Sequence, residues 1–200
     1  PSSIELLESG PLSASIKVVV KMDIPVGLTT ELDEWFRDES DNHTSRTTET
    51  REIAISSTFT LQANAKRLDV VTSFENSCKN RRLRVVFPTR LDCDRTDAEA
   101  NFDVISRDIH VKKDNAYYGK PNPQYPMFRF VDMTDGDNGF AILNNSGLRE
   151  YEAMDSAERP LAVTLLRAYM FRQAPVFGRW EAYPGMERTQ CLGDWEWSYA

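Results

Sequence analysis

The sequence predicts an all-β fold, a large antiparallel β-sandwich with little helix. Three observations carry this prediction. At least eight short segments are rich in β-branched and aromatic residues, polar connectors separate these segments, and almost no segment has the period of a long helix.

The clearest strand pattern lies near the start of the chain. In residues 13–25, SASIKVVVKMDIP, apolar side chains at the even positions from Ile16 to Met22 alternate with Lys17 and Lys21. Because successive side chains of a strand point to opposite faces, this alternation predicts a strand with one face in water.

Further strands follow along the chain. Pro88 is expected to end one of them, and Asp135–Gly139 supplies turn residues that tolerate positive φ between two others. The spacing in residues 161–171 is compatible with a helix, but their Val, Thr and Tyr content favours a strand. The predicted segments are 51–62, 67–76, 83–89, 101–111, 127–145, 149–154 and 161–171.

Composition excludes several classes of protein. Hydrophobic residues make up 40% of the chain and charged residues 28%, as in soluble globular domains. The net charge of −7 argues against nucleic acid or an anionic membrane as partner, and no apolar run is long enough to span a bilayer. No signal peptide is visible, so the sequence predicts a soluble chain and leaves its compartment open. Cys78, Cys93 and Cys191 lack metal-knuckle spacing and predict free thiols.

The two ends of the chain predict a fragment of a longer protein. The first residue is Pro1 rather than Met, and the last residues continue a strand pattern in which Trp195, Trp197 and Tyr199 alternate with polar side chains.

The search for catalytic motifs finds none that is complete. His43 and His110 belong to no HExxH pattern, and Asp108 with His110 would need a third ligand to hold a catalytic zinc. A surface histidine at a strand end is the preferred interpretation. The stretch Asp135–Gly139 resembles part of a calcium loop but lacks the bidentate Glu, and it is interpreted as a hairpin turn.

Several aromatic side chains fall in polar connectors rather than in strands. They could stack on sugar rings or simply pack the loops onto the sandwich, and the second interpretation is favoured. These residues are Trp35, Phe36, Tyr117, Tyr118 and Tyr125.

Six segments, taken in order, resemble the C-terminal β-region of glycoside hydrolase family 38, the α-mannosidases. The segments are ESGPLSASIKV, VTSFENSCKNRRLRVVFPT, ANFDVISRDI, YPMFRFVDMTDGDNGFAILNNSGLREYEA, LAVTLLRAY and PGMERTQCLGDWEWSYA. The most specific parts are RLRVVFPT and the stretch from Gln190 to Gly193. The resemblance spans nearly the whole chain. It implies a supersandwich of the galactose-mutarotase-like type, with residues 1–200 as one C-terminal β-sandwich region of a larger enzyme.

The resemblance also implies the chemistry of that parent enzyme. Family 38 enzymes hydrolyse α-mannosides with retention, through a carboxylate nucleophile, an acid/base carboxyl and a zinc ion held by His and Asp side chains. Those groups lie on a catalytic domain upstream of residue 1, so we expect no catalytic residue, metal ligand or cofactor in this chain. Its expected partners are that catalytic domain and the α-mannoside substrate, and the isolated chain is expected to be inactive.

One residue of this chain is expected at the sugar pocket. In some family members an Arg of the β-region reaches the site, and Arg107 in FDVISRDI is the matching position. A guanidinium suits this role because it forks onto hydroxyls or a carboxylate. The alternative is a surface Arg paired with Asp103 or Asp108. Arg82 and Arg84 are expected to be structural, with salt bridges across the sheet.

The sequence therefore predicts a β-sandwich that packs on the catalytic domain of a retaining α-mannosidase and completes its sugar pocket. A substrate such as mannosylglycerate is a variation of this prediction. The alternative from another class is an autonomous carbohydrate-binding or protein-interaction β-sandwich module.

Overall fold

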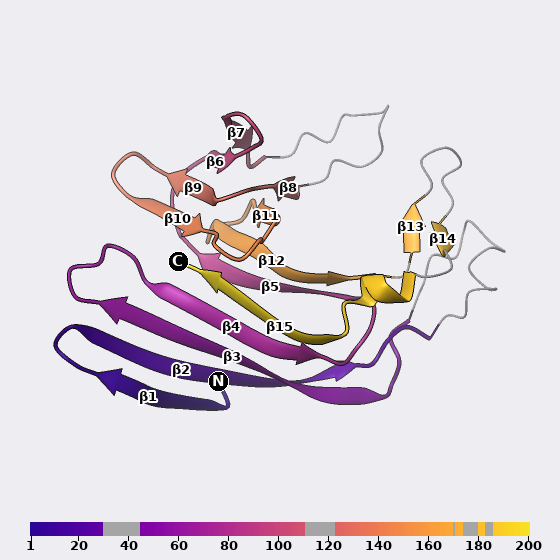
Figure 1. Cartoon of the computed structure of the whole chain (residues 1–200). Helices are drawn as coiled ribbons and strands as arrows, with labels where there is room; N and C mark the ends of the chain where they lie inside the picture. The colour runs from indigo at the N-terminus through magenta and orange to yellow at the C-terminus, as the bar shows by residue number, and fades with distance from the viewer. Residues whose placement is uncertain (30–44, 111–122, 170, 174–179, 183–185) are drawn as a thin grey trace. The chain divides into compact units, whose positions relative to one another are not determined.

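The computed structural model describes residues 1–29, 45–110, 123–169, 171–173, 180–182 and 186–200. Within these ranges the regular structure consists of β-strands, and the only helical element is a short 3-10 helix, η1 (Met186–Gln190). Figure 1 shows strands along the described parts of the chain, and their pairing is antiparallel, so the all-β antiparallel prediction is confirmed.

The strands form three larger sheets and one hairpin (Figure 1). The five-stranded sheet has the order β1 (Ser3–Ser9), β2 (Ser13–Pro25), β3 (Thr50–Gln62), β4 (Asp69–Asn76) and β15 (Gly193–Tyr199). One four-stranded sheet has the order β10 (Gly139–Leu143), β9 (Phe130–Thr134), β6 (Arg95–Glu99) and β7 (Val104–Asp108). The other has the order β5 (Arg81–Pro88), β12 (Pro160–Ala168), β11 (Glu150–Ala153) and β8 (Tyr125–Pro126). The hairpin pairs β13 (Phe171–Gln173) with β14 (Trp180–Ala182).

The chain divides into two compact units. The first unit comprises Pro1–Asn64, Thr72–Arg82 and Leu166–Glu196, and the second comprises Ala65–Val71, Leu83–Leu165 and Trp197–Ala200.

Two sheets pack face to face in the second unit. The ring of Phe87 on β5 lies 5.3 Å from that of Phe140 on β10, and the Tyr151 hydroxyl on β11 lies 2.9 Å from Thr96 Oγ1 on β6. Because side chains of a strand alternate between faces, every second residue of each strand enters the layer between the sheets. Its fully buried members include Ala98, Met127, Val131, Met133, Ile142, Tyr151, Leu161 and Val163.

A buried polar network closes one end of the first unit. The Asn76 side chain, 1% exposed, donates to the main-chain oxygens of Gln190 (2.9 Å) and Cys191 (2.8 Å) and accepts from Arg81. The Gln190 side chain accepts from the Asn80 N–H at 2.8 Å and donates to Asn80 Oδ1 at 2.9 Å. The Gln190–Gly193 stretch is thus tied to the turn between β4 and β5.

The apolar face of β2 is only partly buried. Ile16 and Val20 are 39% and 37% exposed, and the neighbouring Ile4 and Leu6 of β1 are 64% and 65% exposed. Leu6 is paired with Ile16, and Ile4 with Val18. The predicted alternation of β2 therefore exists, but the expectation that its apolar side is a core face holds only in part.

Candidate functional site

Arg107 lies on β7, the edge strand of its sheet, and its side chain is half-buried. Its guanidinium carbon lies 5.1 Å from the centroid of the Tyr125 ring on β8. Its Nη1 donates a hydrogen bond of 3.3 Å to the hydroxyl of Tyr151 on β11. A cation over an aromatic face is attracted by the quadrupole of the ring, by about 0.5–2 kcal/mol depending on desolvation.

The two tyrosines are themselves held in place. Tyr151 is fully buried and bonds through its hydroxyl to Thr96, which is 2% exposed. The rings of Tyr125 and Tyr151 have centroids 6.1 Å apart and are paired across β8 and β11. We call Thr96, Arg107, Tyr125 and Tyr151 the Arg107 clamp.

Neither acidic neighbour of Arg107 pairs with it. Asp108 accepts a hydrogen bond from the guanidinium of Arg95, and Asp103 Oδ1 accepts from the Val104 N–H at 2.8 Å. The alternative interpretation expected an ion pair of Arg107 with Asp103 or Asp108, and neither carboxylate forms one. Among the described residues no carboxylate forms an ion pair with Arg107.

His110 is bound on both sides by carboxylates. Its Nδ1 lies 2.6 Å from Asp155 Oδ2, and its Nε2 lies 3.2 Å from Asp94 Oδ1. The hydrogen bond with Asp155, and then that with Asp94, raise the pKa of His110 above its usual value. The same hydrogen bond lowers the pKa of Asp155, with a second contribution from Arg159. The acidic partners of His110 thus differ from Asp108, the one that the sequence pairs with it.

The described part of the chain contains no set of side chains suited to bind a metal ion. No group of three or more His, Cys, Asp or Glu side chains there has an arrangement that could hold one. The described residues therefore offer no site for the zinc, whose ligands the resemblance assigns to the catalytic domain of the parent enzyme. His43 lies outside the described residues.

The stretch Asp135–Gly139 forms the turn between β9 and β10, as predicted. Gly136 has a φ of +98°, and Asp135 Oδ1 accepts hydrogen bonds from the N–H groups of Asp137 (3.0 Å) and Asn138 (2.7 Å). The bond from Asn138 lowers the pKa of the Asp135 carboxyl. That carboxylate serves the turn itself, as in an Asx turn.

Arg84 has the structural role expected of it. Its Nη1 lies 2.8 Å from Glu152 Oε2, and Gln124 also donates to this oxygen at 3.3 Å. The three cysteines are free thiols; Cys78 and Cys93 are buried and Cys191 is partly so.

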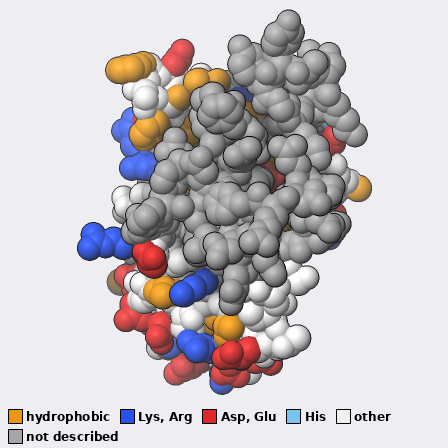
Figure 2. All heavy atoms as spheres, turned by 90° about the vertical axis from the view of Figure 1, so that its right-hand side faces the viewer, with side chains coloured by type: hydrophobic (Ala, Val, Ile, Leu, Met, Phe, Trp, Pro, Cys, Tyr) orange, Lys and Arg blue, Asp and Glu red, His pale blue; other side chains and the backbone are white. Residues whose placement is uncertain are grey.

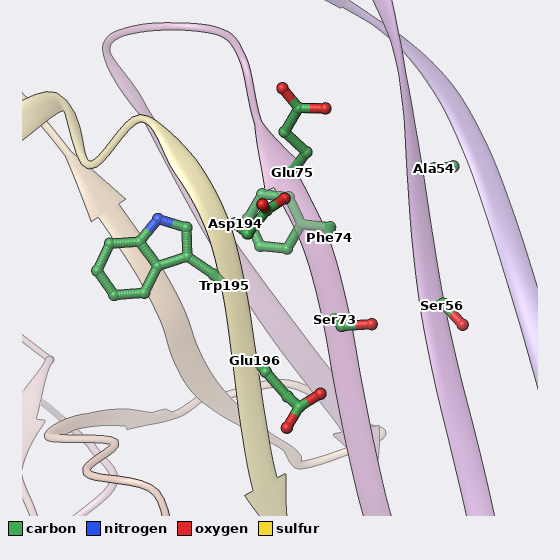
Figure 3. A pocket seen from close by; sticks show the side chains of 8 residues that line it. All are labelled: Ala54, Ser56, Ser73, Phe74, Glu75, Asp194, Trp195 and Glu196. Atoms are coloured by element: carbon green, nitrogen blue, oxygen red, sulfur yellow. The ribbon is translucent and has the colours of Figure 1, made fainter.

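A groove of about 440 Å³ lies in the first unit (Figure 3). Its carboxylates are Glu75 of β4 and Asp194 and Glu196 of β15. Figure 3 shows the Trp195 ring and the Glu196 side chain leaving β15 on opposite sides. The Trp195 indole N–H is bonded to the main-chain oxygen of Cys191 at 2.8 Å. Ala54, Ser56, Ser73 and Phe74 complete the lining.

The described part of the face in Figure 2 carries charges of both signs. On the face in Figure 2, blue Lys and Arg side chains lie among red Asp and Glu side chains rather than in a cluster. Within the described residues, no helix has the length and apolarity to cross a bilayer.

Most of the connector aromatics fall outside the described residues, namely Trp35, Phe36, Tyr117 and Tyr118. Tyr125 is described and lies beneath Arg107. Tyr151 and Thr96 were not among the candidate residues. The available signal was the alternation of Tyr151 with Glu150 and Glu152, which predicts an inward-facing ring but not its partner.

The comparison with protein families identifies the chain. Residues 1–174 match the glycosyl hydrolases family 38 C-terminal domain. The chain belongs to family 38. It is 26% identical over 198 residues to a protein of Halalkalibacterium halodurans named "putative mannosylglycerate hydrolase", covering 96% of this chain and 20% of that protein.

Two solved structures of family 38 proteins have the same fold. An α-mannosidase from Enterococcus faecalis V583 matches 98% of this chain and 21% of its own, with a TM-score of 0.82 and 28% identity. A family 38 protein from Enterococcus faecalis matches 98% of this chain and 22% of its own, with a TM-score of 0.78 and 26% identity. The chain thus spans about a fifth of the length of these relatives.

Proposed function

We propose that this family 38 C-terminal domain packs on the catalytic domain of a retaining α-mannosidase and completes its sugar pocket with Arg107. The single observation that supports this proposal is the environment of the Arg107 side chain. Arg107 is half-buried, fixed over Tyr125, and has no carboxylate partner among the described residues.

A guanidinium that has no carboxylate partner among the described residues suits a sugar pocket. It has five N–H donors in a planar fork, and the Tyr151 hydroxyl engages one nitrogen. The remaining donors are available to adjacent hydroxyls of a mannose ring or to a carboxylate beside it. Charge-assisted hydrogen bonds of this kind are worth about 1.5–3 kcal/mol each.

The surface beside Arg107 supports an interface at this place. Phe102 in the β6–β7 turn is fully exposed, and Val104 and Ile105 on β7 are 49% and 41% exposed. Val104 and Ile105 are adjacent and point to opposite faces of β7, so Ile105 supplies the apolar surface on the Arg107 side. Ile105 and Arg107 lie two residues apart on β7, so their side chains share one face of the strand.

The reactive groups are proposed to belong to the rest of the enzyme. The described residues offer no zinc ligand set, and the resemblance puts the nucleophile and the acid/base carboxyl outside residues 1–200. This chain then contributes contacts that bind and orient the substrate. Such contacts lower the activation barrier of hydrolysis only when they are stronger in the transition state than in the bound substrate.

The test is the substitution Arg107→Ala in the full-length enzyme, assayed with an aryl α-mannoside. We expect kcat/KM to fall about 10- to 100-fold, because one charge-assisted contact to the sugar or its carboxylate is lost. Arg95→Ala is the matched control, because Arg95 lies on the neighbouring strand β6 and pairs with Asp108 at the surface. Equal kinetics of both variants and wild type would remove Arg107 from the pocket.

An anionic substrate is a second candidate, favoured by the same guanidinium, which pairs with no described carboxylate, and by the name of the Halalkalibacterium halodurans relative. In this version Arg107 binds the carboxylate of a glycerate aglycone. Mannosylglycerate would then be preferred over a neutral α-mannoside, and Arg107→Ala would abolish that preference. A loss that is equal for both substrates favours contact with the sugar instead.

A further inference from the structure

The Arg107 clamp contains a buried tyrosine hydroxyl that makes specific hydrogen bonds in addition to its packing contacts. Tyr151 is fully buried, yet its oxygen makes two hydrogen bonds, one to Thr96 at 2.9 Å and one from Arg107 at 3.3 Å. A guanidinium can only donate, so the Tyr151 oxygen accepts from Arg107. Its own proton is then free for Thr96 Oγ1.

We propose that Tyr151 is the positioning residue of Arg107, and that its hydroxyl together with the Tyr125 ring holds the guanidinium in the one orientation that the substrate needs. This inference rests on the proposed function of Arg107. It explains how the long Arg107 side chain, on the edge strand β7, is held in place for binding.

The positioning works through two different elements of the fold. Arg107 is paired with Thr96 across β7 and β6. Tyr151 is paired with Tyr125 across β11 and β8. The clamp therefore joins the two four-stranded sheets within the second unit, and each of its contacts limits a different freedom of the guanidinium. The Tyr125 ring lies beneath the guanidinium carbon, and the Tyr151 hydroxyl accepts from Nη1.

Fixing the guanidinium matters because a mobile Arg side chain loses rotamer entropy when it binds a ligand. When the protein has already ordered the side chain, binding of the substrate does not bear that cost again. Removing the hydroxyl frees the guanidinium, so the substrate must order it. The expected effect is mainly on KM.

The decisive experiment is a double-mutant cycle in the full-length enzyme with an aryl α-mannoside. We expect Tyr151→Phe to raise KM about 3- to 10-fold with kcat changed less than about twofold. In the Arg107→Ala background the same substitution should change KM less than about twofold, because no guanidinium remains to be positioned. A merely structural tyrosine would have the same effect in both backgrounds.

A matched control is Tyr199→Phe. Tyr199 is 4% exposed and packs edge-on against Phe87 within the same unit. The substitution Tyr199→Phe removes the hydroxyl of a buried tyrosine outside the Arg107 clamp, so KM should stay within twofold of wild type. If Tyr151→Phe fails to fold, Tyr125→Leu tests the same positioning, because Tyr125 on β8 is half-buried and contacts the guanidinium. Its effect on KM should also vanish in the Arg107→Ala background.

The outcomes separate the two claims. If Arg107→Ala leaves kcat/KM unchanged, the proposed function fails and this inference fails with it. If Arg107→Ala lowers kcat/KM while Tyr151→Phe has no effect or an additive one, Arg107 keeps its role and the positioning by Tyr151 is refuted.

Discussion

The guanidinium of Arg107 lies over the ring of Tyr125, with its central carbon 5.1 Å from the ring centroid. This relationship joins strand β7 to strand β8, which belongs to the other four-stranded sheet. It separates Arg107 from the ordinary surface arginines of the chain, such as Arg95 and Arg129, which pair with Asp108 and Glu99. Since Arg107 pairs with no carboxylate among the described residues, its remaining donors are available for another molecule.

The isolated 200-residue chain should be catalytically inert. Mixed with an aryl α-mannoside and zinc, it should release no aryl alcohol above the buffer rate, because its proposed role is to bind and orient rather than to attack the glycosidic bond. Calorimetry with mannose oligosaccharides should likewise show no binding heat. Turnover would contradict the division of roles, and clear binding would favour an autonomous carbohydrate-binding module.

Substitutions on the exposed apolar face of β1 and β2 should hardly change the stability of the isolated chain but should lower the stability of the full-length enzyme. Leu6→Lys replaces a side chain that is 65% exposed, so the stability of the isolated chain should change by less than about 0.5 kcal/mol. If the parent enzyme covers this face, the same change should lower its stability by about 1–3 kcal/mol, because a buried Leu is lost and a charge is buried. Thermal unfolding of both proteins is the measurement, and equal effects in the two would contradict coverage of this face.

The network of Asn76 and Gln190 should be a main support of the first unit. Gln190→Ala leaves the Asn80 N–H and side chain without their partners, at a cost of about 2–3 kcal/mol in the free energy of unfolding. Urea unfolding measures this loss. Gln62→Ala at the exposed end of β3 is the control and should stay within about 0.5 kcal/mol of wild type. A Gln190→Ala variant as stable as this control would show that the network is dispensable.

The cluster around His110 predicts a pH dependence of stability. The raised pKa of His110 gives a contribution that is full below about pH 6.5, its ordinary pKa, and is lost as the pH rises through the folded value. The lowered pKa of Asp155 gives a contribution that is present above about pH 4 and is lost as the pH falls through its folded value. The pair therefore stabilises most between about pH 4 and 6.5.

Thermal unfolding of wild type and His110→Gln at several pH values tests this dependence. The difference in Tm should be largest near pH 5 and should shrink toward pH 8 and toward pH 3. A difference that is the same at every pH would mean that the charge of His110 contributes nothing.

The strands with regular alternation could be predicted from the sequence, because their pattern is local. Residues 160–168 form strand β12, as their β-branched content predicted against a helix-compatible spacing. Strand β1 was not predicted, and its sequence explains why. Leu6 and Leu7 are adjacent, which breaks the period of two, and a register shift between Leu6 and Glu8 absorbs the extra residue.

The site could be predicted only in part. Resemblance selected Arg107, but its contact with Tyr151 joins residues 44 positions apart, and no local pattern encodes that contact. The same holds for His110 and Asp155, which meet from separate loops 45 positions apart. Such pairs depend on how sheets stack, and alternation in a strand indicates which face a side chain takes without indicating what it meets there.

The most direct test of the central claim is a structure of the full-length enzyme with a mannose-configured inhibitor bound. The account predicts that a guanidinium nitrogen of Arg107 lies about 3 Å from an oxygen of the inhibitor or of a carboxylate that contacts it, with the guanidinium still over Tyr125. An inhibitor bound at a distance from this domain, with Arg107 directed into solvent, would contradict it.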